Sequence, residues 1–145
     1  MRVVLQRVDY AKCTVNNVIT GAIDKGYMLL VGFTHDDNID KVKKAAKKIA
    51  GLRIFEDENQ KMNLNLETVK GSILSISQFT LYANTNEGNR PSFVDAMKPD
   101  SAKDLYLKFN QELRSYGFKV EEGIFGAHMD IELLNSGPVT IIYDF

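Results

Sequence analysis

Two hydroxyl side chains in the stretch SISQFTLY are the first residues whose types could carry out a hydrolysis. Ser77 and Thr80 could each attack a carbonyl group, provided that a neighbouring base activates the hydroxyl. Side chains alternate between the two faces of a strand. Ser77 and Thr80 therefore face one pocket only if the strand bulges or ends between these two residues. The two histidines of the chain, His35 and His128, lie far from this stretch in the sequence. The pattern is therefore also typical of an ordinary core strand.

A second candidate is the stretch NSGPVT near the end of the sequence, which separates two runs of strand-forming residues. Gly137 tolerates backbone angles that other residues avoid, and Pro138 fixes its own φ angle and has no N–H donor. A hairpin turn explains both residues. A rigid piece of backbone in a binding site is the alternative, although only about 5% of X-Pro bonds in folded proteins are cis.

The elements that must position these residues are short strands and two helices. A turn at Asn16–Asn17 predicts a hairpin, and the apolar run YMLLVGFT predicts a strand buried on both faces. Further strands are predicted for residues 52–57, 72–83, 118–126, 127–135 and 139–145. The sequence therefore predicts an α+β protein, in which a mostly antiparallel, curled β-sheet or barrel is accompanied by two main helices.

Apolar residues at helical spacing identify the two helices. The first is predicted to be capped by Asp36 or Asp37 and to end near Gly51, and the second to be capped by Asp100 or Ser101. The first helix concentrates five lysines: Lys41, Lys43, Lys44, Lys47 and Lys48. We interpret them as a solvated helix face, with local steering of phosphate groups as the alternative.

Composition narrows the class of protein. With 145 residues, 44% of them hydrophobic and 26% charged, we expect a single globular domain over residues 1–145. No apolar run approaches the about 20 residues of a membrane span, and MRVVLQRV lacks the apolar region of a signal peptide. The single cysteine, Cys13, fits a reducing compartment and is expected to be a buried structural thiol. We therefore expect a cytoplasmic protein that does not act at a membrane.

Charge and ligand chemistry exclude further classes. A net charge of −1 argues against a broad nucleic-acid-binding face, so we expect no DNA partner, whereas contact with one end of an RNA stays open. One cysteine and two histidines without metal-ligand spacing predict no metal site. We expect no cofactor.

Five stretches taken together carry a resemblance to a known family. MRVVLQRV, SQFTLY, RPSF, GIFGAHM and NSGPVT resemble, in order and approximate spacing, the D-aminoacyl-tRNA deacylases over essentially the whole chain. SQFT and NSGPVT are specific when they occur together. The resemblance implies a homodimer with active sites at its interface. It implies that Ser77, Gln78, Phe79 and Thr80 of one subunit line the catalytic pocket.

The same resemblance implies what the partner subunit and the substrate contribute. Gly137 and Pro138 of the partner, joined by a cis bond, would face the pocket, and Arg7 would help to hold that partner segment. Phe125 and Met129 match family positions near the pocket. The implied substrate is a tRNA whose acceptor end carries a D-amino acid or glycine, and the implied reaction is hydrolysis of the ester with rejection of L-aminoacyl-tRNA.

Ester hydrolysis develops negative charge on the carbonyl oxygen, and backbone N–H groups around Gln78 and Phe79 are the candidates to stabilise it. Thr80 could be a nucleophile or could orient water or substrate. We favour orientation, because the sequence places no base beside Thr80.

Other classes of function stay open. A serine hydrolase centred on Ser77 could act on small esters or amides, and a β-rich module could grip an RNA 3′ end without turnover. A purely structural dimer leaves SQFT and NSGPVT unexplained as a pair.

Overall fold

The chain begins with a long β-hairpin, in which strand β1 (Arg2–Val15) turns back into strand β2 (Val18–Ile23). Asn16 and Asn17 between them have φ angles of 49° and 64°. Two consecutive positive φ angles are what a two-residue type I′ turn requires, and asparagine adopts them more readily than most residues. The predicted hairpin is thus confirmed in the computed structural model, which describes residues 1–145.

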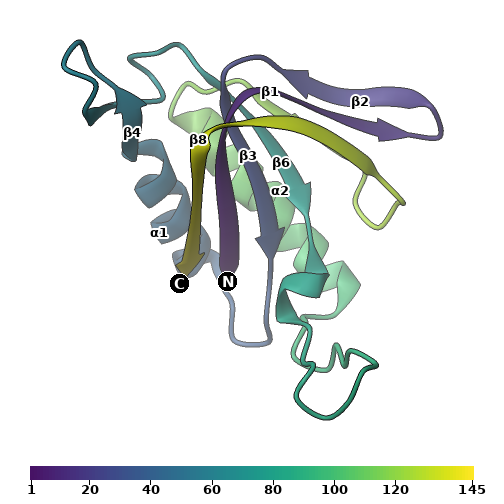
Figure 1. The fold of residues 1–145 in the computed structure, drawn as a ribbon. Helices are drawn as coiled ribbons and strands as arrows, with labels where there is room; N and C mark the ends of the chain where they lie inside the picture. Colours follow the sequence, from purple (N-terminus) through teal and green to yellow (C-terminus); the bar gives the residue numbers. More distant parts are fainter.

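Strand β1 is the centre of a six-stranded sheet (Figure 1). It pairs antiparallel with β2, with β3 (Gly26–Gly32) and with the long last strand β8 (Asp130–Asp144). Strand β3 is almost entirely buried along its length, which confirms the prediction from its continuous apolar run.

Beyond β3 the sheet continues with two parallel strands, β6 (Ser72–Ser77) and β7 (Val120–Glu122). The sheet curls until β7 approaches β2 at the other side. A Cβ atom added to Gly21 of β2 would lie 2.7 Å from the backbone oxygen of Glu122 in β7. The sheet is therefore nearly closed into a barrel, as the sequence predicted, and antiparallel pairs predominate in it.

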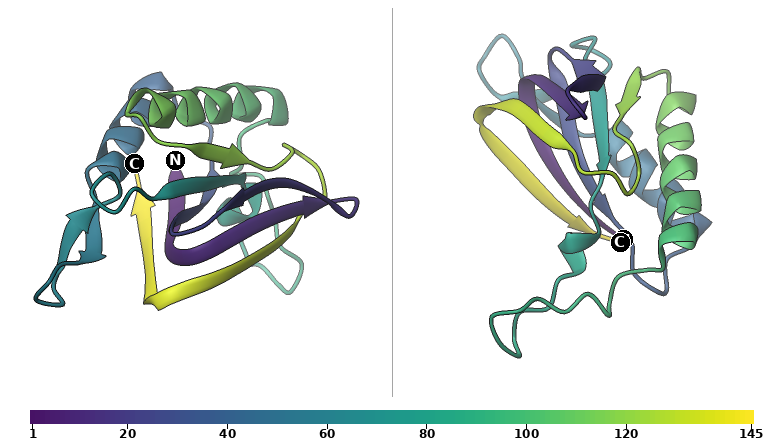
Figure 2. Two further views of the ribbon diagram at one scale, coloured as in Figure 1. Left: turned by 90° about the horizontal axis from the view of Figure 1, so that it is seen from above. Right: turned by 90° about the vertical axis from the view of Figure 1, so that its right-hand side faces the viewer.

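Two helices, α1 (Ile39–Ala50) and α2 (Pro99–Ser115), cover one face of the sheet (Figure 2). The larger hydrophobic core fills the space between the helices and the sheet, and its fully buried side chains include Leu5, Tyr27 and Phe109. Neither helix combines the length and the apolar character that crossing a bilayer demands.

A second, smaller core lies within the curled sheet and contains Val8, Cys13, Met28 and Ile76. Cys13 is a free, buried thiol, as its strand-forming neighbours predicted. A separate hairpin of β4 (Arg53–Glu56) and β5 (Met62–Asn65) projects beside α1. The sequence predicted the first of these two strands and missed the second, which is short and polar.

The lysines of α1 point away from the core. Lys43, Lys44, Lys47 and Lys48 are exposed, whereas Lys41 pairs with the buried carboxylate of Asp37 at 3.0 Å. The buried face of the helix consists of small and branched apolar residues.

Both helices begin at other residues than predicted. Asn38 caps α1 by accepting hydrogen bonds from two backbone N–H groups, because the carboxylate of Asp37 is already bound at 2.6 Å by the N-terminal ammonium group of Met1. Helix α2 begins at Pro99 after Lys98, with no side-chain cap. Proline suits the first helical position, since its fixed φ angle is helical and its missing N–H group would have no partner there.

The strand predicted for residues 72–83 ends at Ser77 instead. Residues Phe79–Tyr82 form a short 3₁₀ helix, η1. The backbone N–H of Gln78 donates to the oxygen of Val31 at 2.8 Å. Strand β3 ends one residue later, at Gly32. The chain therefore loses its pairing partner and tightens into a helical turn.

The end of the chain also differs from the three strands predicted there. Strand β7 covers only three residues, residues 123–129 form a loop, and β8 runs through the NSGPVT stretch without reversing direction. The hairpin interpretation of that stretch is wrong, because the residues before and after it both pair with β1: Val8 lies opposite Asn135, and Gln6 lies opposite Thr140. The residues between are a bulge in one bent strand.

Candidate active site

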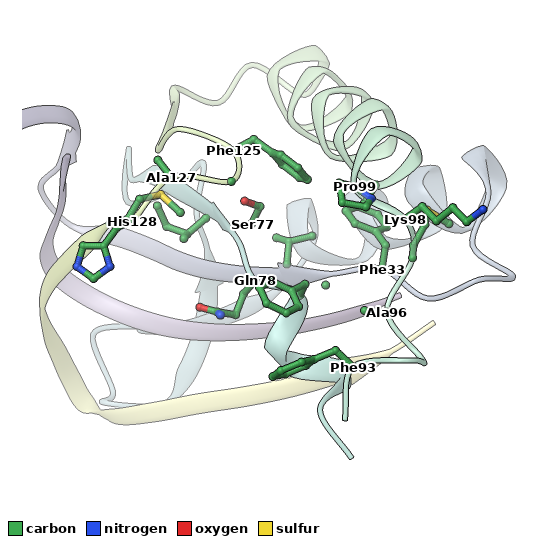
Figure 3. A pocket seen from close by; sticks show the side chains of 18 of the residues that line it. Phe33, Ser77, Gln78, Phe93, Ala96, Lys98, Pro99, Phe125, Ala127 and His128 are labelled. Atoms are coloured by element: carbon green, nitrogen blue, oxygen red, sulfur yellow. The ribbon is translucent and has the colours of Figure 1, made fainter. Parts of the chain in front are cut away.

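A pocket of about 800 Å³ opens where the parallel strands β3 and β6 end (Figure 3). Two parallel strands finish at the same edge of a sheet, so the residues that follow them come together there. The first turn of α2 and the loop before β8 complete the walls. The lining is mostly apolar: Val31, Gly32, Phe33, His35, Ile76, Ser77, Gln78, Phe79, Phe93, Val94, Ala96, Met97, Lys98, Pro99, Ala102, Phe125, Gly126, Ala127, His128, Met129 and Ile131.

The SQFT stretch turns the corner at this pocket. Ser77 is the last residue of β6, and its side chain lies against the pocket beside that of Gln78 (Figure 3). The Phe79 ring contacts the Phe93 ring edge-on, with 5.0 Å between ring centroids. Thr80 lies outside the lining, and its Oγ1 accepts a hydrogen bond from Gln78 Nε2 at 2.5 Å. The strand thus ends between Ser77 and Thr80, which is one of the two conditions for both hydroxyls to lie near one site.

Phe125 and Met129 also line the pocket, from the loop between β7 and β8. The Phe125 ring lies 6.0 Å from the ring of Tyr106 on α2. The hydroxyl of Tyr106 donates to the backbone oxygen of Ser75 at 2.7 Å. Burial raises the pKa of Tyr106 to about 12, so the hydroxyl stays protonated as a donor. Tyr106 thereby supports this wall from behind.

The outer wall consists of a loop that the sequence analysis did not single out, apart from the RPSF stretch. Thr34 Oγ1 donates to the oxygen of Asp95 at 2.6 Å, and His35 Nε2 lies 2.6 Å from the oxygen of Val94. The N–H of Met97 donates to the oxygen of Phe33 at 3.0 Å. These bonds fasten residues 94–97 to the end of β3. Recognising the parallel pairing of β3 and β6 would have placed Phe33 and His35 at the site.

The backbone donors of the pocket differ in availability. The N–H of Gln78 donates to the oxygen of Val31, so it is not free to stabilise a developing negative charge, contrary to the expectation from the sequence. The N–H of Phe79 starts η1 and has no backbone acceptor. The first N–H groups of a helix lack a partner within it. Phe79 therefore offers a free donor within the pocket lining.

Neither the Ser77 nor the Thr80 hydroxyl has a base bound to it. His35 is engaged with Val94, and His128 Nε2 faces Asp130 at 3.6 Å. Neither histidine is hydrogen-bonded to Ser77 or Thr80. The structure contains no cluster of three or more side chains of the metal-binding types.

Gly137 and Pro138 lie at the bend of β8, outside this pocket, and both are exposed. The bond between them is cis, as the resemblance implied. Gly137 has a φ angle of +130°, and a Cβ atom added there would lie 2.8 Å from Arg7 Nη2 and 2.8 Å from Val139 Cγ2. One chain therefore does not bring this segment and the SQFT stretch together.

Arg7 holds the bend from within the same chain. It is 7% exposed, its Nε donates to the oxygen of Ser136 at 3.0 Å and its Nη1 donates to the oxygen of Ile54 at 2.6 Å. Its Nη2 lies 3.7 Å from Glu56 Oε1. The resemblance implied that Arg7 holds the Gly-Pro segment of a partner, and within one chain Arg7 contacts the segment of its own β8. Because Arg7 lies opposite the bulge of β8 on the neighbouring strand, its side chain reaches that backbone directly.

Comparison with known proteins adds a family match. The family model described as D-Tyr-tRNA(Tyr) deacylase matches residues 4–144. The D-aminoacyl-tRNA deacylase of Fusobacterium nucleatum subsp. nucleatum is 61% identical over 144 residues, which cover 99% of this chain and 95% of that protein. The D-aminoacyl-tRNA deacylase of Lactobacillus gasseri is 58% identical and is covered, like this chain, to 99%.

Solved structures share the fold. A protein called c-Myc DNA Unwinding Element Binding Protein superposes with a TM-score of 0.92 at 35% identity, covering 100% of this chain and 99% of that one. A structure described as that of a probable eukaryotic D-amino acid tRNA deacylase gives a TM-score of 0.87 at 20% identity, covering 99% and 98%. The second likeness shows the fold alone.

Proposed function

The chain belongs to the D-Tyr-tRNA(Tyr) deacylase family and is a hydrolase, and we propose that it cleaves the ester bond of D-aminoacyl-tRNA. The products are the free D-amino acid and tRNA. The observation that carries this proposal is the family match over residues 4–144, which includes both the SQFT and the NSGPVT stretches. The function is thus proofreading of the handedness of amino acids before translation uses them.

The complete site is formed by two copies of the chain. One protomer supplies the pocket beside Ser77, and the other supplies Gly137 and Pro138. The support for this arrangement is that the bend of β8 is exposed and lies apart from the pocket in one chain. Arg7 sets the position of that bend before the two copies meet.

Discrimination between mirror-image substrates comes from main-chain atoms rather than from side-chain fit. The D- and L-forms differ only in where hydrogen and side chain are attached to one carbon. An apolar pocket separates similar groups weakly, because one methylene changes binding by only about 1–3 kcal/mol. The backbone at Gly137 and Pro138 acts as a wall where the L side chain would project. Glycine has no side chain to be rejected, so glycyl-tRNA enters too.

Chemistry then proceeds by direct attack of water. Water adds to the ester carbonyl carbon, and the carbonyl oxygen gains negative charge that the N–H of Phe79 stabilises. The bond to the ribose oxygen breaks as the tetrahedral intermediate collapses, and that oxygen takes a proton from the attacking water. The adjacent 2′-hydroxyl of the ribose assists this proton transfer. Thr80, bound to Gln78, orients water or substrate and does not form a covalent intermediate.

The function is tested by one matched assay. D-tyrosyl-, L-tyrosyl- and glycyl-tRNA are incubated with the protein, and the release of each amino acid is followed over time. We expect rapid cleavage of the D-ester, measurable cleavage of the glycyl ester and no cleavage of the L-ester above the spontaneous rate. Equal rates for the two tyrosyl esters would refute the proposal. Equal binding of both without turnover would instead indicate a module that grips the RNA end.

Replacing Thr80 by alanine is expected to leave most of the deacylation rate intact. Removal of a general base lowers kcat by about 100-fold or more. The loss in Thr80→Ala should be much smaller than that. Ser77→Ala is the matched control for removal of a neighbouring hydroxyl. Complete loss of activity in Thr80→Ala, with unchanged binding of the charged tRNA, would instead point to a threonine ester intermediate.

A serine hydrolase is the second candidate. It is favoured by one observation, that Ser77 lines a pocket together with His35 and His128. The contacts of the histidines speak against it, because His35 is hydrogen-bonded to Val94 and His128 faces Asp130, and neither is hydrogen-bonded to Ser77. Covalent labelling of Ser77 by a serine-directed phosphonate would decide in its favour.

A further inference from the structure

One charged side chain stands at the rim of the pocket. Among the residues that line the pocket, Lys98 is the only lysine, arginine, aspartate or glutamate. Its ammonium group belongs to none of the ion pairs of the chain. In Figure 3 the side chain extends outward, away from Ser77, at the side of the pocket formed by α2. A permanent positive charge without a partner is therefore presented at the entrance of an apolar cavity.

The backbone around Lys98 is fixed on both sides. The N–H of Met97 donates to Phe33 at 3.0 Å, and the oxygen of Lys98 accepts the first bond of α2, from the N–H of Ala102 at 3.0 Å. Ala96 forms an isolated bridge with Thr34. The backbone of Lys98 therefore stays at one position relative to the pocket. Only its flexible side chain can move the ammonium group.

The chemistry of a charged tRNA predicts where its nearest anion must lie. The terminal nucleoside and an esterified tyrosine carry no negative charge, and the first anion is the phosphodiester on the 5′ side of that nucleoside. Transfer of an ionised group into an apolar cavity is strongly unfavourable. When the ester enters the pocket, this phosphate therefore remains outside, at the rim.

We propose that Lys98 binds the phosphodiester that precedes the terminal nucleoside of the charged tRNA. The inference rests on the proposed function, and it adds a contact on the far side of the ribose from the ester. A lysine serves here as a point charge on a flexible stem, which follows the phosphate without demanding one geometry. With the phosphate held at the rim, the ribose is oriented so that its ester faces Ser77 and Phe79. Lys98 is thus a positioning residue.

The exposed lysines of α1 have a different role from Lys98. None of these four lysines lines the pocket: Lys43, Lys44, Lys47 and Lys48. They could attract the phosphates of RNA, but a phosphate bound there would not orient the ester in the pocket. Lys103 provides the matched control, because it is exposed in the helix that follows Lys98 and also lies outside the lining.

A pair of small substrates that differ by one phosphate tests the proposal. These are 3′-O-(D-tyrosyl)adenosine and the same ester carrying a 5′-phosphate, and kcat/KM is measured for each under single-turnover conditions at high enzyme concentration. We expect the wild-type protein to prefer the phosphorylated ester by about fivefold, which is the scale of one charge-assisted contact at an exposed site. Lys98→Gln should lose the preference, so that the ratio of kcat/KM for the two esters falls to about one. Lys98→Arg and Lys103→Gln should keep the preference.

The outcomes separate this proposal from the proposed function. If D-tyrosyl-tRNA is not cleaved faster than L-tyrosyl-tRNA, the function itself fails. If D-tyrosyl-tRNA is cleaved faster, two results would refute the role of Lys98. One is a wild-type protein without preference for the phosphorylated ester, and the other is a Lys98→Gln protein that retains the preference. Cleavage of charged tRNA without cleavage of either small ester would also refute it, since the required contacts would lie elsewhere in the tRNA.

Discussion

Arg7→Ala is expected to lower the free energy of unfolding by about 3–5 kcal/mol and to remove most of the deacylase activity. The guanidinium group is buried and joins the bend of β8 to β4 through the oxygens of Ser136 and Ile54. Hydrogen bonds from a charged donor contribute about 1.5–3 kcal/mol each, and both acceptors lose their partner together. If the site is formed by two copies as proposed, kcat/KM should fall even under conditions where the variant is folded, because the released bend would no longer hold Gly137 in position.

Urea unfolding and kcat/KM for D-tyrosyl-tRNA measure the two effects on the same preparation. Lys12→Ala is the control, since Lys12 is another basic residue of β1 whose ion pair with Glu132 is largely exposed. Exposed pairs contribute about 1 kcal/mol or less, so this variant should remain stable and active. An Arg7→Ala protein with wild-type activity under conditions where it is folded would contradict the role of Arg7 in placing the bend.

Gly137→Ala is expected to reduce kcat/KM for D-aminoacyl-tRNA by about 100-fold, the scale of a displacement of about 1 Å in a positioned group. The added Cβ atom would lie within 2.8 Å of both Arg7 Nη2 and Val139 Cγ2. The φ angle of +130° is also one that side-chain-bearing residues rarely adopt. The backbone must therefore shift, and the wall that we propose to reject the L side chain would shift with it.

Gly88→Ala separates the two causes. Gly88 has a similar φ angle of +126°, but no atom lies within 4 Å of an added Cβ atom. Deacylation of matched D- and L-tyrosyl-tRNA should be nearly unchanged in this variant. Equal losses in Gly88→Ala and Gly137→Ala would show that backbone angle alone, and not the contact with Arg7, accounts for the effect.

The sequence predicted elements whose signals are local. Asn16–Asn17 forms the hairpin turn as expected, and apolar spacing located both helices to within a few residues. The predicted caps of the helices were wrong. For α1 the reason is a distant group: the ammonium group of Met1 binds Asp37, so Asn38 caps the helix instead. No property of residues 36–38 alone reveals that competition.

The site depended on pairing between distant segments, which local patterns do not report. The end of β6 at Ser77 follows from the end of its partner β3, and the SISQFTLY stretch contains no glycine or proline that would break a strand. The straight passage of β8 through NSGPVT likewise follows from β1 on its other side. Ser77, Gln78, Phe79, Phe125 and Met129 meet in the pocket, whereas the bonding of residues 94–97 to the end of β3, which forms the outer wall, was missed for the same reason.

The pairing of β1 with β8 also bears on how the protein reaches its structure. Arg2 and Asp144, which face each other in this ladder, are 142 positions apart in the sequence. Closing so long a loop costs entropy before its contacts repay any of it, so this ladder should form late and slowly in folding. Until it forms, one side of β1 offers unpaired N–H and C=O groups to any other strand. The interval before β8 docks is therefore the stage at which newly made chains are most exposed to aggregation.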